Sequence, residues 1–400
     1  MGISSQLKLL WPFYLDALIS PILFFIPAFS ILYFSNVGLN LFQLGLLLSA
    51  SSLASLLSEI PTGAFADLYG RKLSVLLGFF FEGLILILIF FMGNSFHSLL
   101  ISFFFLGLAM TFSSGSKEAW VVDLINKNNK HLTKNYFTKI KSFDSFALIF
   151  SGILGAFFVK LFGLSIIWIV SGLSYFLSIL VLIFAKEVFY RRKVKVRDSF
   201  TQITKQSTKS FNYSRKHKVL FLFFIAAAIL SFAGYLDSQL AWTPFFMDMG
   251  LKEHYFGYLW SIIGLAGVIA PLLTSKLIKR NNERKFIMTI IMLTILVLIF
   301  IVFVNNLYWG FFVLIISALF TQMSNPAERI YFHRFIPAKL RASVGSVEAM
   351  WLSLIGIASV PLAGFLVDNI GARYTIFLSA IFMIPAAIIY YNIKERRLFV

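Results

Sequence analysis

The sequence predicts an all-α membrane protein with twelve transmembrane helices. Of its 400 residues, 59% are hydrophobic and 13% are charged, and this charged fraction is about half that of an average soluble domain. The apolar residues gather into blocks of about twenty, which is the length of a helix that spans a bilayer. The strands of a β-barrel would instead alternate polar and apolar residues over about ten positions.

The predicted helices follow one another through short linkers, except at 124–140 and 187–217. We expect no cleaved signal peptide, because the first block lacks a charged leader and a small-residue cleavage site. The twelve blocks run over 9–34, 40–66, 73–94, 98–123, 141–162, 164–186, 218–246, 254–278, 286–304, 307–327, 343–367 and 372–393.

The positions of Lys and Arg predict that both termini are cytoplasmic. With that orientation, the outer side keeps only Lys160, Lys252 and Arg373 of the 35 basic residues, and such an excess of basic residues marks cytoplasmic loops. The net charge of +18 then reflects contact with the anionic inner leaflet of the lipid bilayer. We therefore expect a multi-pass protein of the cell (inner or plasma) membrane and no nucleic-acid partner.

The long middle linker divides the chain into two expected domains. These are an N-terminal six-helix bundle at 1–187 and a C-terminal six-helix bundle at 218–400, joined by a cytoplasmic linker loop at 188–217. The linker is rich in Ser, Thr, Gln and Lys and has no apolar block. It is either a solvated tether or a surface helix.

A weak internal repeat supports the division into two halves of the same orientation. A shift of about 212 residues places Gly38-Leu39 on Gly250-Leu251 and Ser49 on Ser261. Parallel repeats of this kind are a transporter architecture, with the substrate site between the halves.

The stretch from Glu59 to Lys72 carries acidic and basic side chains and several glycines at the predicted junction of the second and third helices. Glycine permits close packing or a tight turn, so we expect a tight cytoplasmic hairpin here. The order Gly, three residues, Asp, two residues, Gly, Arg, Lys resembles the signature loop of the major facilitator superfamily (MFS). Its defining positions are Gly63, Asp67, Gly70, Arg71 and Lys72.

Further segments resemble a subgroup of bacterial and archaeal efflux carriers within that superfamily. They are Glu59-Ile60-Pro61-Thr62 and the run Ser114–Trp120 with the following Asp123. The resemblance implies the MFS fold and alternating access by rocking of two six-helix bundles. It also implies a monomer, because the fold commonly works as one.

The resemblance assigns gating roles to the signature segment. Asp67 would brace the start of the eleventh helix, near Arg341, where the helix dipole favours a negative charge. Arg71 would pair with an acid at a neighbouring helix end, for which Asp67, Glu118 and Asp123 are the candidates. The alternative is a static surface pair of Asp67 and Arg71 at a spacing of four residues.

Three departures from the family pattern leave proton antiport a hypothesis. The second-half counterpart of the signature, at 276–285, lacks the glycines and the Asp. Thr111 stands where many proton antiporters of the family carry Arg. The stretch Ser151-Gly152-Ile153-Leu154-Gly155 lacks the proline of the antiporter signature.

Five acids fall within or at the ends of predicted spans, where an ionisable residue is costly and is a functional candidate. Burial favours the neutral form of a carboxyl group, which suits proton uptake and release. The candidates for proton coupling or substrate binding are Asp16, Glu82, Asp144, Asp237 and Glu348. The alternatives are a local hydrogen bond for Asp16 and a protonated structural role for Glu82. For Asp144 and Glu348 the alternative is a position at the cytoplasmic interface.

The sequence therefore predicts a secondary active transporter that exports small amphipathic compounds in exchange for protons. The alternatives are a metabolite importer, a lipid flippase, or a non-transporting membrane scaffold or receptor. We expect no enzyme and no cofactor, because the chain has no phosphate-binding glycine loop and no nucleophile elbow. We expect no metal, because the chain has no cysteine and its five histidines are scattered.

Overall fold

The structure is a computed structural model that describes residues 3–93, 95–128, 132–188, 217–278, 282–336 and 340–393. All regular elements in these ranges are helical. They are α1 (Ile3–Ile22), α2 (Ile26–Asn36), α3 (Leu41–Tyr69), α4 (Arg71–Phe91), α5 (Phe96–Asn128), α6 (Leu132–Phe162), α7 (Ile166–Leu182), α9 (Lys218–Leu236), α10 (Gln239–Asp248), α11 (Tyr255–Leu277), α12 (Glu283–Ile299), the 3-10 helix η1 (Phe300–Phe303), α13 (Leu307–Arg334), α14 (Arg341–Ile370) and α15 (Ala372–Asn392).

Eleven helical spans within the described ranges are long and apolar enough to cross a membrane, and Ile166–Leu182 is a shorter apolar helix. Together these twelve segments correspond to the twelve predicted blocks, and most of their ends lie within a few residues of the predicted ends. Helices suit this composition because each one satisfies its own backbone hydrogen bonds, which lipid cannot do. The all-α prediction is confirmed, and the orientation of the termini stays a prediction.

The first predicted span is broken between α1 and α2, at 23–25. Pro21 and Pro27 flank the break, and proline removes a backbone donor from a helix. Two buried serines take up backbone groups that the break frees. Ser171 Oγ accepts a hydrogen bond from the Phe25 N–H at 3.0 Å, and Ser151 Oγ donates to the Phe24 carbonyl at 2.9 Å.

The seventh predicted span is broken in the same way, between α9 and α10. Asp237 is the C-cap that follows α9, and Ser238 is the N-cap of α10, where its side chain accepts a hydrogen bond from the Leu240 N–H at 3.3 Å. The repeat shift of about 212 residues brings Phe25 onto Asp237, so the two breaks occupy corresponding positions of the repeat. Interrupted helices at corresponding positions are a feature of transporter binding sites.

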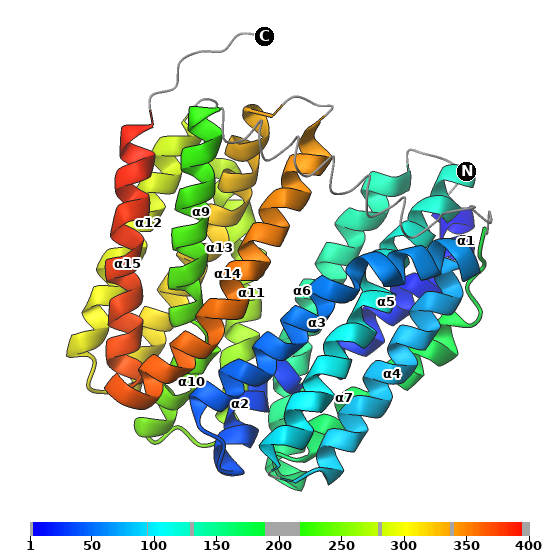
Figure 1. Ribbon diagram of the computed structural model, residues 1–400, viewed down its shortest axis with the longest axis horizontal. Coiled ribbons are helices and arrows are strands. Elements are labelled where there is room, and N and C mark those ends of the chain that lie inside the picture. The colour runs from blue at the N-terminus through cyan, green and yellow to red at the C-terminus, as the bar shows by residue number, and fades with distance from the viewer. Residues whose placement is uncertain are drawn as a thin grey trace. The chain divides into compact units, whose positions relative to one another are not determined.

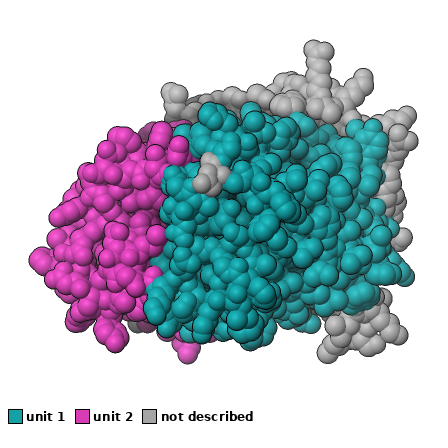
Figure 2. Space-filling model, turned by 90° about the horizontal axis from the view of Figure 1, so that it is seen from below, with its two compact units in different colours: residues 1–39, 46–200, 252–265 teal, residues 40–45, 201–251, 266–400 magenta. Residues whose placement is uncertain are grey.

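The chain separates into two compact units, which Figure 2 shows in different colours. Unit 1 takes residues 1–39, 46–200 and 252–265, and unit 2 takes 40–45, 201–251 and 266–400. The units depart from the expected domains in two short segments, 40–45 and 252–265, each of which belongs to the unit formed mainly by the other half. The division into two six-helix bundles stays a prediction, and residues 189–216 of the expected linker lie outside the described ranges.

Within unit 1, α4 packs between α5 and α7, and α1 packs against α6 and α7 (Figure 1). The buried core of this unit includes Phe13 and Trp120, whose rings meet edge to face at 4.8 Å between centroids. Large aromatic side chains bury much apolar area and add favourable edge-to-face contacts, so they hold these helices together. The core residues are Leu10, Phe13, Val75, Phe79, Trp120, Val121, Leu124, Ile125, Tyr136, Leu182 and Ala185.

Within unit 2, α15 packs against both α9 and α12, and α12 also packs against α13 (Figure 1). A small buried cluster of Ala270, Ile290 and Met323 joins α11, α12 and α13. Aromatic rings join α9 to α13, where Phe223 stacks on Phe332 at 4.9 Å between centroids.

Candidate functional site

The signature segment is more helical than the hairpin loop that the sequence predicts. Helix α3 continues through Pro61 to Tyr69, α4 begins at Arg71, and Gly70 alone separates them. Gly70 has φ 109° and ψ 143°, which is a backbone conformation that only glycine adopts readily. The expected loop is therefore corrected to a one-residue turn, which fixes the directions of the charged side chains on both sides.

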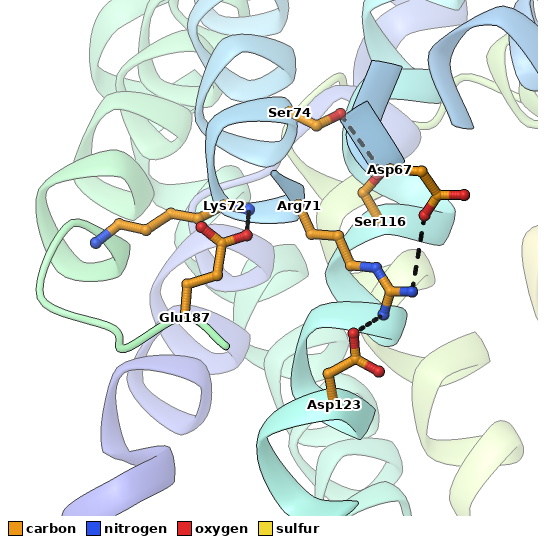
Figure 3. A network of polar contacts seen from close by, with 7 residues as sticks. All are labelled: Asp67, Arg71, Lys72, Ser74, Ser116, Asp123 and Glu187. Carbon is orange, nitrogen blue, oxygen red and sulfur yellow. Dashed lines mark hydrogen bonds and ion pairs between the residues drawn. The ribbon is translucent and has the colours of Figure 1, made fainter. Parts of the chain in front are cut away.

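Arg71 is the centre of an ion-pair network at this turn (Figure 3). Its Nη1 lies 2.6 Å from Asp123 Oδ2 on α5, and its Nη2 lies 3.9 Å from Asp67 Oδ1 at the end of α3. The Arg71 side chain is 19% exposed and that of Asp123 is 39% exposed. The pair with Asp123 therefore ties the turn to the neighbouring helix, in a partly solvated setting.

Glu187 is a second anchor of the turn, and sequence reasoning missed it. Its Oε1 accepts a hydrogen bond from the Lys72 N–H at 2.9 Å (Figure 3). This backbone donor belongs to the first turn of α4, where no intrahelical partner exists and a carboxylate is favoured. A Cβ on Gly70 would lie only 3.2 Å from the same oxygen. Glu187 lies 115 residues after Lys72 in the sequence, so only the tertiary structure shows that the two are in contact.

The side chain of Lys72 binds the end of the seventh helix. Lys72 Nζ donates to the carbonyls of Ile183 and Ala185 at 2.7 and 2.9 Å. These carbonyls follow the C-terminal end of α7, which attracts a cation. The turn is therefore fastened to α7 by both its backbone and its lysine side chain.

Two serines next to the turn join α4 to α5. Ser74 Oγ donates to the Phe112 carbonyl at 2.7 Å and lies 3.4 Å from Ser116 Oγ (Figure 3). Both serines are buried. These contacts hold the first turn of α4 against the helix that carries Asp123.

The other members of the predicted gating set lie at the surface. Gly63 is exposed, and a Cβ there would meet no atom within 4 Å. Glu118 is also exposed, on α5. The expected contact of Asp67 with the start of α14 stays a prediction, and the side chains of 341–343 lie outside the described ones.

Asp16 of α1 is fully buried and forms an ion pair with Lys117 of α5. The Lys117 side chain is 29% exposed, and its Nζ lies 5.6 Å from the centre of the Phe79 ring. Asp16 Oδ1 is buried and has no hydrogen-bond partner among the described residues. From the sequence, Lys117 was an inner-side base and part of the run Ser114–Trp120, with no role of its own, and the signal for its role was its position inside the predicted span 98–123.

Glu82 of α4 is 2% exposed, in the same unit. It accepts a hydrogen bond from Ser113 Oγ at 2.7 Å and one from the Tyr175 hydroxyl, and it interacts electrostatically with Lys117. Hydroxyl donors surround this carboxyl group, and Lys117 contributes the positive potential. A carboxyl group in such surroundings can take up and release a proton without losing its hydrogen bonds, because hydroxyl groups both donate and accept.

Asp144 of α6 is partly exposed and lies 3.8 Å from Lys141, three residues earlier. It also interacts electrostatically with Lys117. Three of the five acids that the sequence singled out, Asp16, Glu82 and Asp144, therefore belong to unit 1. Only Asp16 is in direct contact with Lys117, and Asp144 has Lys141 as its nearest cation.

The other two predicted acids lie in unit 2. Asp237 Oδ1 accepts a hydrogen bond from Trp242 Nε1 at 2.7 Å, at the break between α9 and α10. Glu348 of α14 is 6% exposed and pairs with Arg329 of α13 at 3.0 Å. A further pair, Arg334 with Glu283 at 3.3 Å, joins α13 to the start of α12 and was not predicted.

Side chains that ligate metals are spread apart in the described part of the chain. No group of three or more His, Cys, Asp or Glu residues there is placed to hold a metal ion. The chemistry that the described clusters offer is proton exchange and charge pairing.

Comparison with known proteins gives the family. The family model described as the Major Facilitator Superfamily matches residues 17–359 and 248–398. YxaM, an MFS-type transporter of Bacillus subtilis (strain 168), is 27% identical over 263 residues, and the match covers 64% of this chain and 63% of YxaM. The match thus spans less than two thirds of that relative. YitZ, another MFS-type transporter of that organism, is 21% identical over 34% of this chain and 84% of its own length.

Solved structures with the same fold include transporters of different named kinds. A mutant of the nucleoside transporter NupG has a TM-score of 0.77 at 14% identity, with coverage of 96% of this chain and 100% of NupG. A bacterial homologue of the human lysosomal transporter Spinster has a TM-score of 0.75 at 15% identity, with coverage of 98% of this chain and 97% of the homologue. These likenesses confirm the fold, and the family match covers most of the sequence. The chain is thus a member of the major facilitator superfamily.

Proposed function

We propose that this protein is a proton-coupled secondary transporter that exports small amphipathic compounds by alternating access. The observation that carries the proposal is the presence of two buried carboxyl groups in unit 1, Asp16 with its ion pair to Lys117 and Glu82 with its hydroxyl partner Ser113. Secondary transporters of this fold place coupling and substrate groups near the middle of the membrane.

The different partners of the acids in unit 1 support proton coupling. Asp16 pairs with Lys117 and Asp144 pairs with Lys141, whereas the direct partner of Glu82 is the Ser113 hydroxyl group. An uncompensated charge in a low-dielectric region is costly, so a carboxyl group without an ion pair favours the uptake of a proton. We therefore assign the exchangeable proton to Glu82 and the fixed negative charge to Asp16.

The break between α9 and α10 supports a positively charged, partly apolar substrate. Asp237 offers a carboxylate beside the indole ring of Trp242, which stacks on Phe246 at 5.8 Å between centroids. A carboxylate next to aromatic rings suits an amphipathic cation, through charge and cation–π attraction. The described electrostatic partners of Asp237 include no cation.

The direction of transport and the membrane belong to the same proposal. We place the protein in the cell membrane, as a monomer, with the proton gradient as its energy source. The solved structures of this fold include a nucleoside transporter and a bacterial homologue of the iron transporter ferroportin, so the fold by itself selects no substrate class. A metabolite importer or a lipid flippase would use the same architecture.

Transport assays in inverted membrane vesicles test the proposal. A fluorescent amphipathic cation should accumulate when the vesicle interior is acidic, and Glu82→Gln should abolish the effect of the pH gradient. Asp248→Asn, an acid at the end of α10 without an assigned role, is the matched control and should behave as the wild type. Uptake at the same rate with and without the pH gradient would refute proton coupling. Accumulation in intact cells, with none in inverted vesicles, would indicate import.

A further inference from the structure

An acid that the sequence analysis did not single out, Asp368, caps the start of α3. Its Oδ1 accepts a hydrogen bond from the Leu41 N–H at 3.1 Å, and its Oδ2 accepts one from the Phe42 N–H at 2.8 Å. Asp368 lies near the C-terminal end of α14, and all these atoms belong to unit 2. A carboxylate that receives two N–H groups of a first helical turn is held by charge-assisted hydrogen bonds and by the helix dipole.

The local sequence at this helix start leaves these two donors for Asp368. Asn40 and Gln43 form a reciprocal capping box, in which Asn40 Oδ1 accepts from the Gln43 N–H at 2.8 Å and Gln43 Oε1 accepts from the Asn40 N–H at 3.1 Å. The first turn of a helix has several N–H groups without an intrahelical partner. The box satisfies two of them, and Asp368 satisfies the Leu41 and Phe42 donors that lie between.

Two glycines allow the two helices to approach closely enough for this contact. A Cβ on Gly364 of α14 would lie 2.0 Å from the Leu41 carbonyl oxygen, and a Cβ on Gly45 of α3 would lie 2.5 Å from Pro361 Cα. Real Cβ atoms do not come so near to backbone atoms, so an alanine at either position would push the helices apart. The backbone contact therefore extends over about one turn of each helix.

We propose that Asp368 is a reversible latch between α3 and α14 that closes the outer side of the transporter. The proposal rests on the alternating-access function proposed above, in which α3 belongs to the first half of the chain and α14 to the second. In the predicted orientation both contacting helix ends lie on the outer side, as does Arg373. Alternating access requires contacts that form in one state and break in the other.

The chemistry of the contact suits a latch that opens. Asp368 is exposed, so water can replace the two N–H donors when the helices separate. The carboxylate and the freed helix start are both well hydrated in the open state, which keeps the free-energy difference between closed and open small.

The chain contains no cysteine, which permits a direct test. A single introduced cysteine is then the only thiol that a maleimide can modify. Leu44 of α3 is 2% exposed and precedes Gly45 at the contact with α14. In a Leu44→Cys protein, we expect Asp368→Asn to raise the rate of modification by a membrane-impermeant maleimide about tenfold, which corresponds to about 1.4 kcal/mol in the opening equilibrium. Asp368→Glu, which keeps the charge, should raise the rate less.

The matched control is Asn369→Ala, since Asn369 is exposed next to Asp368 and donates to the Phe365 carbonyl of its own helix. It should leave the modification rate unchanged. Gly364→Ala provides an independent variant that separates the helices by steric contact, and it should raise the rate as well. The idea fails if folded Asp368→Asn protein, judged by its melting temperature, reacts at the rate of the Leu44→Cys parent, or if Asn369→Ala reacts equally fast.

The labelling is done without substrate and without a pH gradient, so it separates the latch from the transport proposal. Faster labelling together with absent transport would support the latch and refute the export function. Unchanged labelling in a protein that transports normally would refute the latch alone.

Discussion

Arg71 at the start of α4 lies 2.6 Å from Asp123 of α5, closer than the 3.9 Å that separates it from Asp67, its neighbour in the signature segment. The nearer partner is thus remote in the sequence, and the more distant one is four residues away. The pair with Asp123 holds the turn against α5, and it leaves Asp67 less constrained for a contact that changes during transport.

The Arg71–Asp123 pair is expected to contribute modestly to stability. Asp123 is 39% exposed, and partly exposed ion pairs are worth about 0.5–1 kcal/mol. A double-mutant cycle of Arg71→Gln and Asp123→Asn, followed by thermal unfolding in detergent, should give a coupling energy of this size. A coupling energy near zero would contradict the assignment of Asp123 as the main partner.

Asp67→Asn tests the gating role of the signature acid. We expect slower transport with a melting temperature close to that of the wild type, because a gate acts on the transition between states and only weakly on folding. Asp248→Asn serves as the control for removal of an acid at a helix end. Transport at the wild-type rate in Asp67→Asn would show that the Asp67–Arg71 pair is static.

Gly70→Ala should destabilise the protein by about 1–3 kcal/mol, because a positive φ strains any residue with a Cβ. The new methyl group would also approach the carboxylate of Glu187, which is 3.2 Å from the Cβ position. Gly63→Ala is the matched control in the same motif, on an exposed helical position with open space around it. It should be neutral or stabilising by about 0.5–1 kcal/mol. Equal melting temperatures for the two variants would contradict this account of the turn.

Lys117→Met should destabilise the protein by about 3–5 kcal/mol at neutral pH, because it leaves the buried carboxylate of Asp16 without its partner. The double variant Asp16→Asn, Lys117→Met should recover most of the loss, since this buried charge is then removed. Thermal unfolding in detergent measures both variants. A double variant that melts no higher than Lys117→Met would show that Asp16 does not depend on Lys117.

Ser171→Ala tests the break between α1 and α2. It removes the partner of the Phe25 N–H, and a buried donor left unsatisfied costs about 1–3 kcal/mol. Ser174→Ala is a suitable control, because this buried hydroxyl bonds to the carbonyl of Ser171 one turn earlier in its own helix. Thermal unfolding should separate the two variants clearly, and a smaller loss in Ser171→Ala than in Ser174→Ala would be evidence against the assigned role.

The sequence alone was sufficient to predict the spans and the family. Continuous apolar blocks of about twenty residues cross lipid as helices, so their lengths predict where helices such as α4 and α15 begin and end. The signature residues around Gly70 also lie together in the chain, and a local motif is readable without a structure.

The partners of those residues came only from the tertiary structure. Glu187 reaches the start of α4, Lys117 pairs with Asp16, and Asp368 caps α3 from the far end of the chain. The one-residue turn at Gly70 was also beyond prediction, because its polar and glycine residues are compatible with either a loop or a helix end. Sequence patterns encode local preferences and burial, while pairs between distant helices depend on how all the helices pack together.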